Sequence, residues 1–100
     1  MIMIMIIIGI CTIHLRREEN HSLKEKRSAL KPLLARLHKE FNVAAAEVDD
    51  HDDWRSAAIG VAAVGNSRAH VDRVLQAVVR WVETSRVEWQ LVDYEMEVLP

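Results

Sequence analysis

The fold is decided by a stretch near the start of the chain, residues 21–31, with the sequence HSLKEKRSALK. Ser22, followed three residues later by Glu25, forms a capping box. In this motif the serine oxygen accepts from the Glu25 backbone N–H, and the carboxylate reaches back to the Ser22 N–H. The stretch therefore predicts a helix that begins at Ser22. The apolar residues of this helix recur at spacings of three and four and form one stripe: Leu23, Leu30, Leu33, Leu34, Leu37 and Phe41.

Pro32 lies inside this predicted helix. Proline removes a backbone donor in a helix interior. We expect a kink or local widening at Pro32, or a helix boundary nearer to it, within an element that otherwise remains helical.

Strands and helices alternate along the rest of the chain. An isoleucine-rich strand over 4–15 and a polar loop over 16–21 precede the helix, which spans 22–41. Strands over 42–48 and 56–64 follow, then a helix capped by Ser67 or Asn66 that ends near Thr84, and a strand over 87–99. The order βαββαβ predicts a single ferredoxin-like α+β domain over 1–100. In that fold two helices cover one face of a four-stranded antiparallel sheet.

The strands over 4–15 and 56–64 are apolar or small on both faces, so we place them at the centre of the sheet. The helices cover only one face, and the other face would expose more apolar surface than monomers usually tolerate. We therefore expect a homodimer through the open sheet face. The alternative is that loops, or the long charged side chains of the last strand, shield that face.

Charge is distributed unevenly, although the net charge is only −2. Residues 14–40 hold eight Lys/Arg and four Glu, whereas residues 41–100 hold five Arg and eleven Asp/Glu. This asymmetry predicts one basic surface on an acidic body. The candidate nucleic-acid-binding residues are Lys24, Lys26, Arg27 and Lys31 on the solvent side of the first helix, with Arg16 and Arg17 in the loop before it.

These cations predict contacts to the phosphate backbone of RNA or the ribosome, with little sequence specificity. Many ferredoxin-like domains stack bases on aromatic side chains of the central strands. The strands over 4–15 and 56–64 have no aromatic residue, which argues strongly against that mode here. Two alternatives stay open. The basic helix face is only solvated, or the chain is a homodimeric protein-interaction module without nucleic-acid binding, whose basic face docks an acidic partner.

No motif predicts catalysis, a cofactor or a metal site. The acidic loop Asp49-Asp50-His51-Asp52-Asp53 lacks the glycine and terminal glutamate of a calcium loop, so a solvated turn is favoured over a metal site. The five histidines are scattered, and there is no glycine-rich phosphate loop. We expect no enzymatic activity. Trp81 is expected to pack in the core, and Trp54 and Trp89 are candidate interface anchors.

Cys11 is the only cysteine and lies in an apolar run, which predicts a buried thiol and a reducing compartment. The apolar start of the chain lacks the basic region and cleavage site of a signal peptide, and it is too short to span a bilayer. We expect a cytoplasmic protein without membrane association.

The chain resembles the YlxP-like family, a small bacterial group of unknown function. The resemblance covers nearly the whole chain and rests on Ser22–Arg27, Phe41–Val43, Ala46–Val48, Trp54 with Ile59–Ala62, Asn66–Val71 and Asp93–Glu95. Pro32 and the isoleucine–methionine start are less typical of the family. The resemblance implies a ferredoxin-like fold, no established enzymatic activity, and genes beside those for translation and ribosome-maturation factors. It supplies no catalytic residues.

Overall fold

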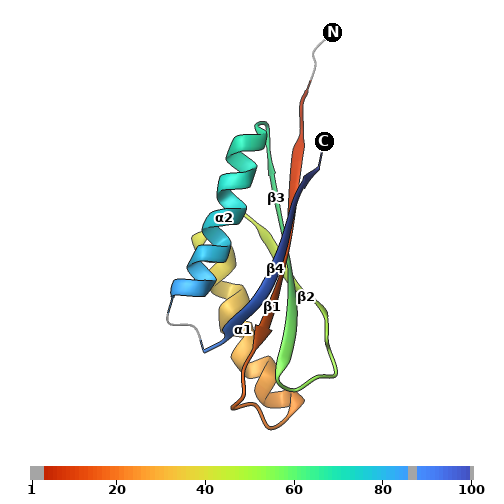
Figure 1. Ribbon diagram of the computed structural model, residues 1–100, viewed down its shortest axis with the longest axis vertical. Helices are drawn as coiled ribbons and strands as arrows, with labels where there is room; N and C mark the ends of the chain where they lie inside the picture. The colour runs from red at the N-terminus through yellow and green to blue at the C-terminus, as the bar shows by residue number, and fades with distance from the viewer. Residues whose placement is uncertain (1–3, 86–87, 100) are drawn as a thin grey trace.

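The structure is a computed structural model that describes residues 4–85 and 88–99. Its elements follow the predicted order βαββαβ (Figure 1). They are β1 (Ile7–Arg16), α1 (Leu23–Glu40), β2 (Ala44–Asp49), β3 (Ser56–Gly65), α2 (Arg68–Thr84) and β4 (Gln90–Leu99). β1 begins three residues later than expected. The expected start of the last strand, Val87, lies outside the described residues.

The four strands form one antiparallel sheet in the order β2-β3-β1-β4, which confirms the ferredoxin-like fold with β1 and β3 at its centre. Both helices lie on the same face of the sheet (Figure 1). The core fills the space between these layers and includes Ile13, Leu37, Ile59 and Leu75, each no more than 1% exposed. Burial of this apolar layer is the main force that holds the helices on the sheet.

The capping box at the start of α1 is confirmed in its main feature. Ser22 is the N-cap, and its Oγ accepts from the Glu25 N–H at 3.1 Å. The reciprocal bond differs from the expectation, because the Glu25 carboxylate accepts from the His21 N–H at 2.8 Å rather than from Ser22. α1 continues through Pro32, which lies on the exposed side of the helix.

Helix α2 is capped by Ser67, one of the two residues predicted for this position, and packs closely on β1. Gly9 makes this approach possible. A Cβ atom built at Gly9 would lie 2.7 Å from Leu75 Cδ1 and closer still to Val71 Cγ1. The missing side chain therefore sets the distance between α2 and the sheet.

The face of the sheet opposite the helices is uncovered within the described chain; we call it the outer face. Ile8 and Ile10 of β1 are 40% and 41% exposed there, and Val64 of β3 is 63% exposed.

The expected alternation of β4 fails at Val92, which is 62% exposed beside an irregularity in the β1–β4 register. Tyr94 is also exposed rather than buried.

None of the helices in the described ranges is long and apolar enough to cross a membrane.

Candidate nucleic-acid interface on helix α1

The basic face of α1 follows from the way the helix packs. Leu30, Leu33 and Leu37 are buried against the sheet, so the opposite side of the helix points to solvent. Lys24, Arg27 and Lys31 lie on that side and are exposed. We call these three residues the α1 stripe. Their spacings of three, four and seven place them along one line of the helix surface, about 10 Å long.

The α1 stripe is not neutralised by its surroundings. Among residues 4–85 and 88–99, none of its three side chains forms an ion pair. Glu25, the nearest acidic residue in the helix, accepts from the His21 N–H and caps the helix. Three fixed cations are therefore available to an anionic partner.

Lys26 was predicted to lie beside the α1 stripe on the solvent side of the helix, and this prediction is wrong. Its side chain is 1% exposed. The Nζ atom lies 2.8 Å from Glu47 Oε2 and donates to the Asp50 carbonyl at 2.5 Å. The physical reason is helical phase: Lys26 precedes the buried residues Leu30 and Leu33 by four and seven positions, so it shares their face.

The same phase argument was available from the sequence and would have found this buried lysine. No sequence signal indicated its partner, because Glu47 comes from β2. Glu47 Oε2 is buried and makes no hydrogen bond within the described residues. The ammonium at 2.8 Å therefore compensates the cost of burying that oxygen.

Arg16 and Arg17 are engaged in contacts within the molecule. Arg16 Nε donates to Glu18 at 2.7 Å, and this bond raises the pKa of the guanidinium and lowers the pKa of the Glu18 carboxyl. Arg17 donates to Asn20 Oδ1 and, at 3.2 Å, to Glu88. The structure thus sets both arginines apart from the α1 stripe, since their charges already have acidic partners.

Asn20 was missed by sequence reasoning, although it is fully buried. Its side-chain amide donates to the Trp54 carbonyl at 2.8 Å while its oxygen accepts from Arg17. These bonds join the loop before α1 to the loop before β3. They help to fix the position from which α1 starts.

The tryptophans divide differently from the expectation. Trp89 is 4% exposed, and its indole N–H donates to the Ala29 carbonyl of α1 at 3.2 Å, so it is a packing residue rather than an interface anchor. Trp81 is partly buried; its ring contacts Phe41 edge to face, and Arg36 lies 5.0 Å above it. Trp54 is 48% exposed, and its role as an interface anchor stays a prediction.

The outer face is unsuited to bases or phosphates. β1 and β3 carry no aromatic side chain there. The register places three exposed carboxylates of β4, those of Asp93, Glu95 and Glu97, beside β1. His14 Nε2 lies 3.2 Å from Glu95. A row of carboxylates repels a polyanion, which directs any nucleic acid to the helix layer.

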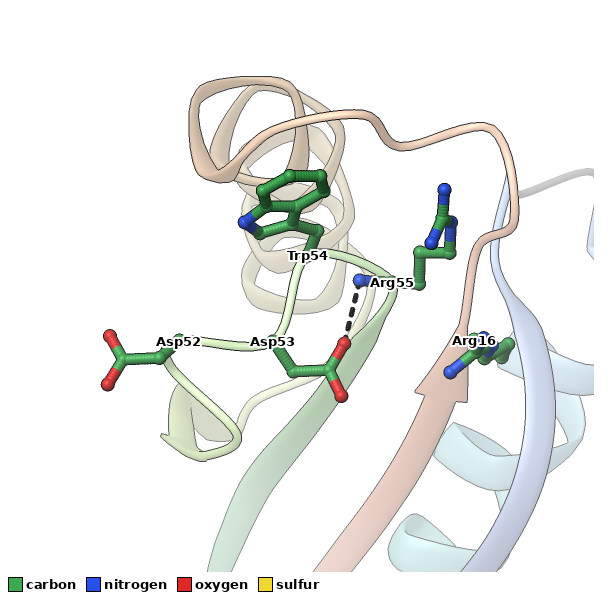
Figure 2. Close-up of a pocket in the computed structure, with 5 residues that line it drawn as sticks. All are labelled: Arg16, Asp52, Asp53, Trp54 and Arg55. Carbon is green, nitrogen blue, oxygen red and sulfur yellow. Dashed lines mark hydrogen bonds between the residues drawn. The ribbon is translucent and has the colours of Figure 1, made fainter.

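The acidic loop before β3 is organised by its own backbone, as Figure 2 shows for part of it. Asp53 Oδ1 accepts from the N–H groups of Arg55 and Ser56 at 2.9 and 3.1 Å, and these bonds lower the pKa of the carboxyl. The Asp52 carboxylate points away from the arginines of the adjoining 630 Å³ hollow (Figure 2). Among the described residues, no three metal-ligating side chains lie together.

The fold and these residues define a small ferredoxin-like α+β protein with two notable surfaces, the α1 stripe and the outer face. The model of the family described as a protein of unknown function (DUF503) matches residues 8–96, and the chain belongs to this family. It is 37% identical over 76 residues to the uncharacterised protein YlxP of Bacillus subtilis (strain 168). That alignment covers 68% of this chain and 83% of YlxP. The resemblance to the YlxP-like family is thus confirmed.

Proposed function

We propose that this protein is a non-enzymatic RNA- or ribosome-associated accessory factor that contacts phosphate groups through the α1 stripe. The observation that carries the proposal is the state of its three cations. Lys24, Arg27 and Lys31 are exposed and lack ion pairs in the described chain, whereas Arg16, Arg17 and Lys26 are each paired. Cations aligned on a rigid helix can contact phosphates without further ordering of the backbone.

The distribution of charge supports this orientation. The exposed acidic residues of β4 lie on the outer face, on the other side of the sheet from α1. RNA would therefore bind to the side of the protein that carries the helices. Contacts to phosphate alone give weak dependence on sequence and strong dependence on salt.

A second candidate is a protein-interaction module that binds no nucleic acid. The exposed apolar side chains of the outer face favour it, because contiguous apolar surface is typical of protein interfaces. In this case the α1 stripe would dock a protein with an acidic surface. The two candidates differ in whether free RNA competes for the α1 stripe.

The experiment is co-sedimentation with ribosomes and with free ribosomal RNA over a salt series. The test variant is Arg27→Glu/Lys31→Glu, and the matched control is Arg73→Glu/Arg80→Glu on the exposed side of α2, which changes the net charge equally. The proposal predicts salt-sensitive binding that the α1 variant loses and the α2 variant keeps. Equal loss in both variants, or an unaffected α1 variant, would contradict it. Ribosome binding that free RNA cannot displace would favour the second candidate.

A further inference from the structure

We propose that the outer face is the interface with a second copy of this chain, packed so that β4 of one copy lies over β2 of the other. The proposal is independent of the function proposed for α1, because the α1 stripe lies on the other side of the sheet. Three features of the outer face carry it: its size, its self-complementary shape and the position of its carboxylates.

The outer face approaches the size that each partner of a stable dimer buries. β1, β3 and β4 have ten residues each, so the strand spacing and the rise per residue give the outer face a size of roughly 19 by 33 Å, shorter along β2. Side-chain relief raises the accessible area above this projected area, toward the roughly 800 Å² that each partner of a standard interface buries. Ile4 and Ile6, which directly precede β1, are 80% and 61% exposed and add apolar surface beyond the end of the sheet.

The shape of the outer face is complementary to itself. Alanine and glycine create a hollow of 380 Å³ over β2 and β3, lined by Ala44, Ala46, Gly60 and Ala62 among others. Ile10 of β1 also lines it and is paired in register with Ala62. A two-fold axis parallel to the strands, between β1 and β3, would place Ile10 of each copy over Ala62 of the other. A large side chain would thus fill each hollow, as a two-fold interface requires.

The carboxylates select this axis over the alternative. Asp93, Glu95 and Glu97 form a row along β4 at one edge of the outer face. An axis perpendicular to the strands would place this row against the same row of the second copy, where like charges repel. An axis parallel to the strands places Glu97 over Ala44 and Glu95 over Ala46 of β2 instead. Of the three carboxylates, Asp93 alone then meets a like charge, that of Asp49 at the end of β2. The carboxylates then lie at the rim of the interface, where polar groups remain in contact with water.

The first test is the molar mass of the intact protein by sedimentation equilibrium at micromolar concentration. We expect the mass of two chains for the wild type. Ile10→Lys should weaken association by about tenfold or more, because it buries a charge at the centre of the interface. In a monomer this lysine would lie beside Glu97, its partner in register, so the fold should tolerate it. Ala62→Lys, which fills the hollow, should have the same effect, and Ala35→Lys on the exposed side of α1 is the matched control.

Cross-linking tests the orientation. Residues 46 and 95 lie on opposite edge strands of one sheet, too far apart for a disulfide within a chain. The native Cys11 is buried and need not be removed. Under oxidation, Ala46→Cys/Glu95→Cys should form a covalent dimer and Glu95→Cys alone should not. A wild-type monomer, folded lysine variants that associate like the wild type, or a dimer linked through Glu95→Cys alone would overturn the proposal.

Discussion

Lys26 Nζ lies 2.8 Å from Glu47 Oε2. In the sequence, Lys26 belongs to a run of charged residues, 24–27, that looks solvent-exposed. The pair joins the first turn of α1 to β2, and the bond from Lys26 to the Asp50 carbonyl adds the turn that follows β2. Asp50 has a φ of 61°, a left-handed conformation that is uncommon for a residue other than glycine. The lysine therefore helps to hold a turn that the backbone alone would not favour.

Lys26→Met should lower the free energy of unfolding by about 3 kcal/mol, because it leaves the buried Glu47 oxygen and the Asp50 carbonyl without their partner. The double variant Lys26→Met/Glu47→Leu should recover much of this loss, since it removes both charges. Urea unfolding followed by circular dichroism measures both. Unchanged stability in Lys26→Met would show that the pair does not form. RNA binding by the folded Lys26→Met protein should equal that of the wild type, in contrast to any variant of the α1 stripe.

Cys11 should be inert in the native protein. Burial, and to a smaller degree the charge of Glu95, raise the pKa of its thiol to about 11. The thiol is therefore protonated at neutral pH. A protonated thiol is a poor nucleophile, because the thiolate is the reactive form. Reaction with a disulfide reagent at pH 8 should be slow in buffer and complete in denaturant. Rapid labelling of the folded protein would contradict the burial of Cys11.

Asp53→Ala should lower the melting temperature at neutral pH, because two backbone N–H groups lose their acceptor. The pKa of the folded-state carboxyl lies below its ordinary value of 3.8. Its stabilising effect is therefore complete above that ordinary value and disappears as the pH falls through the lowered one. The melting temperatures of the variant and the wild type should therefore converge as the pH falls below the lowered pKa. Asp52→Ala, which removes a carboxylate that points away from the arginines in Figure 2, is the control and should change the melting temperature little at either pH.

Gly9→Ala should cost about 1–3 kcal/mol of stability, the usual cost of overpacking a core. The added methyl group would collide with Val71 and Leu75, two residues of α2 that are buried in the core of the protein. Gly60→Ala is the matched control on the outer face. There the new methyl group meets Val48, whose side chain is 53% exposed and free to turn aside. Chemical denaturation should therefore show a larger loss for Gly9→Ala than for Gly60→Ala.

The parts of the fold that could be predicted from the sequence depend on local signals. The caps at Ser22 and Ser67 and the leucine spacing of α1 involve residues a few positions apart. The apolar character of both faces of β1 and β3 was enough to place these strands at the centre of the sheet.

The parts that could not be predicted depend on contacts between distant segments. The partner of Lys26 lies 21 residues away in β2, and that of Arg17 lies 71 residues away at Glu88. The exposure of Val92 follows from a register irregularity beside His14, which alternation of apolar residues does not reveal. Of the six cations predicted to bind RNA, the three in the α1 stripe have no ion pair in the described chain.

The most direct test of the central claim is the salt dependence of binding to an unstructured RNA oligonucleotide, measured by fluorescence anisotropy. Three phosphate contacts predict a slope of about −2 in a plot of log K against log salt concentration. Arg27→Ala should weaken binding and reduce the slope by about 0.7, whereas Arg73→Ala on α2 should leave both unchanged. A slope near zero, or equal slopes for the wild type and Arg27→Ala, would contradict the proposal that the α1 stripe binds the RNA backbone.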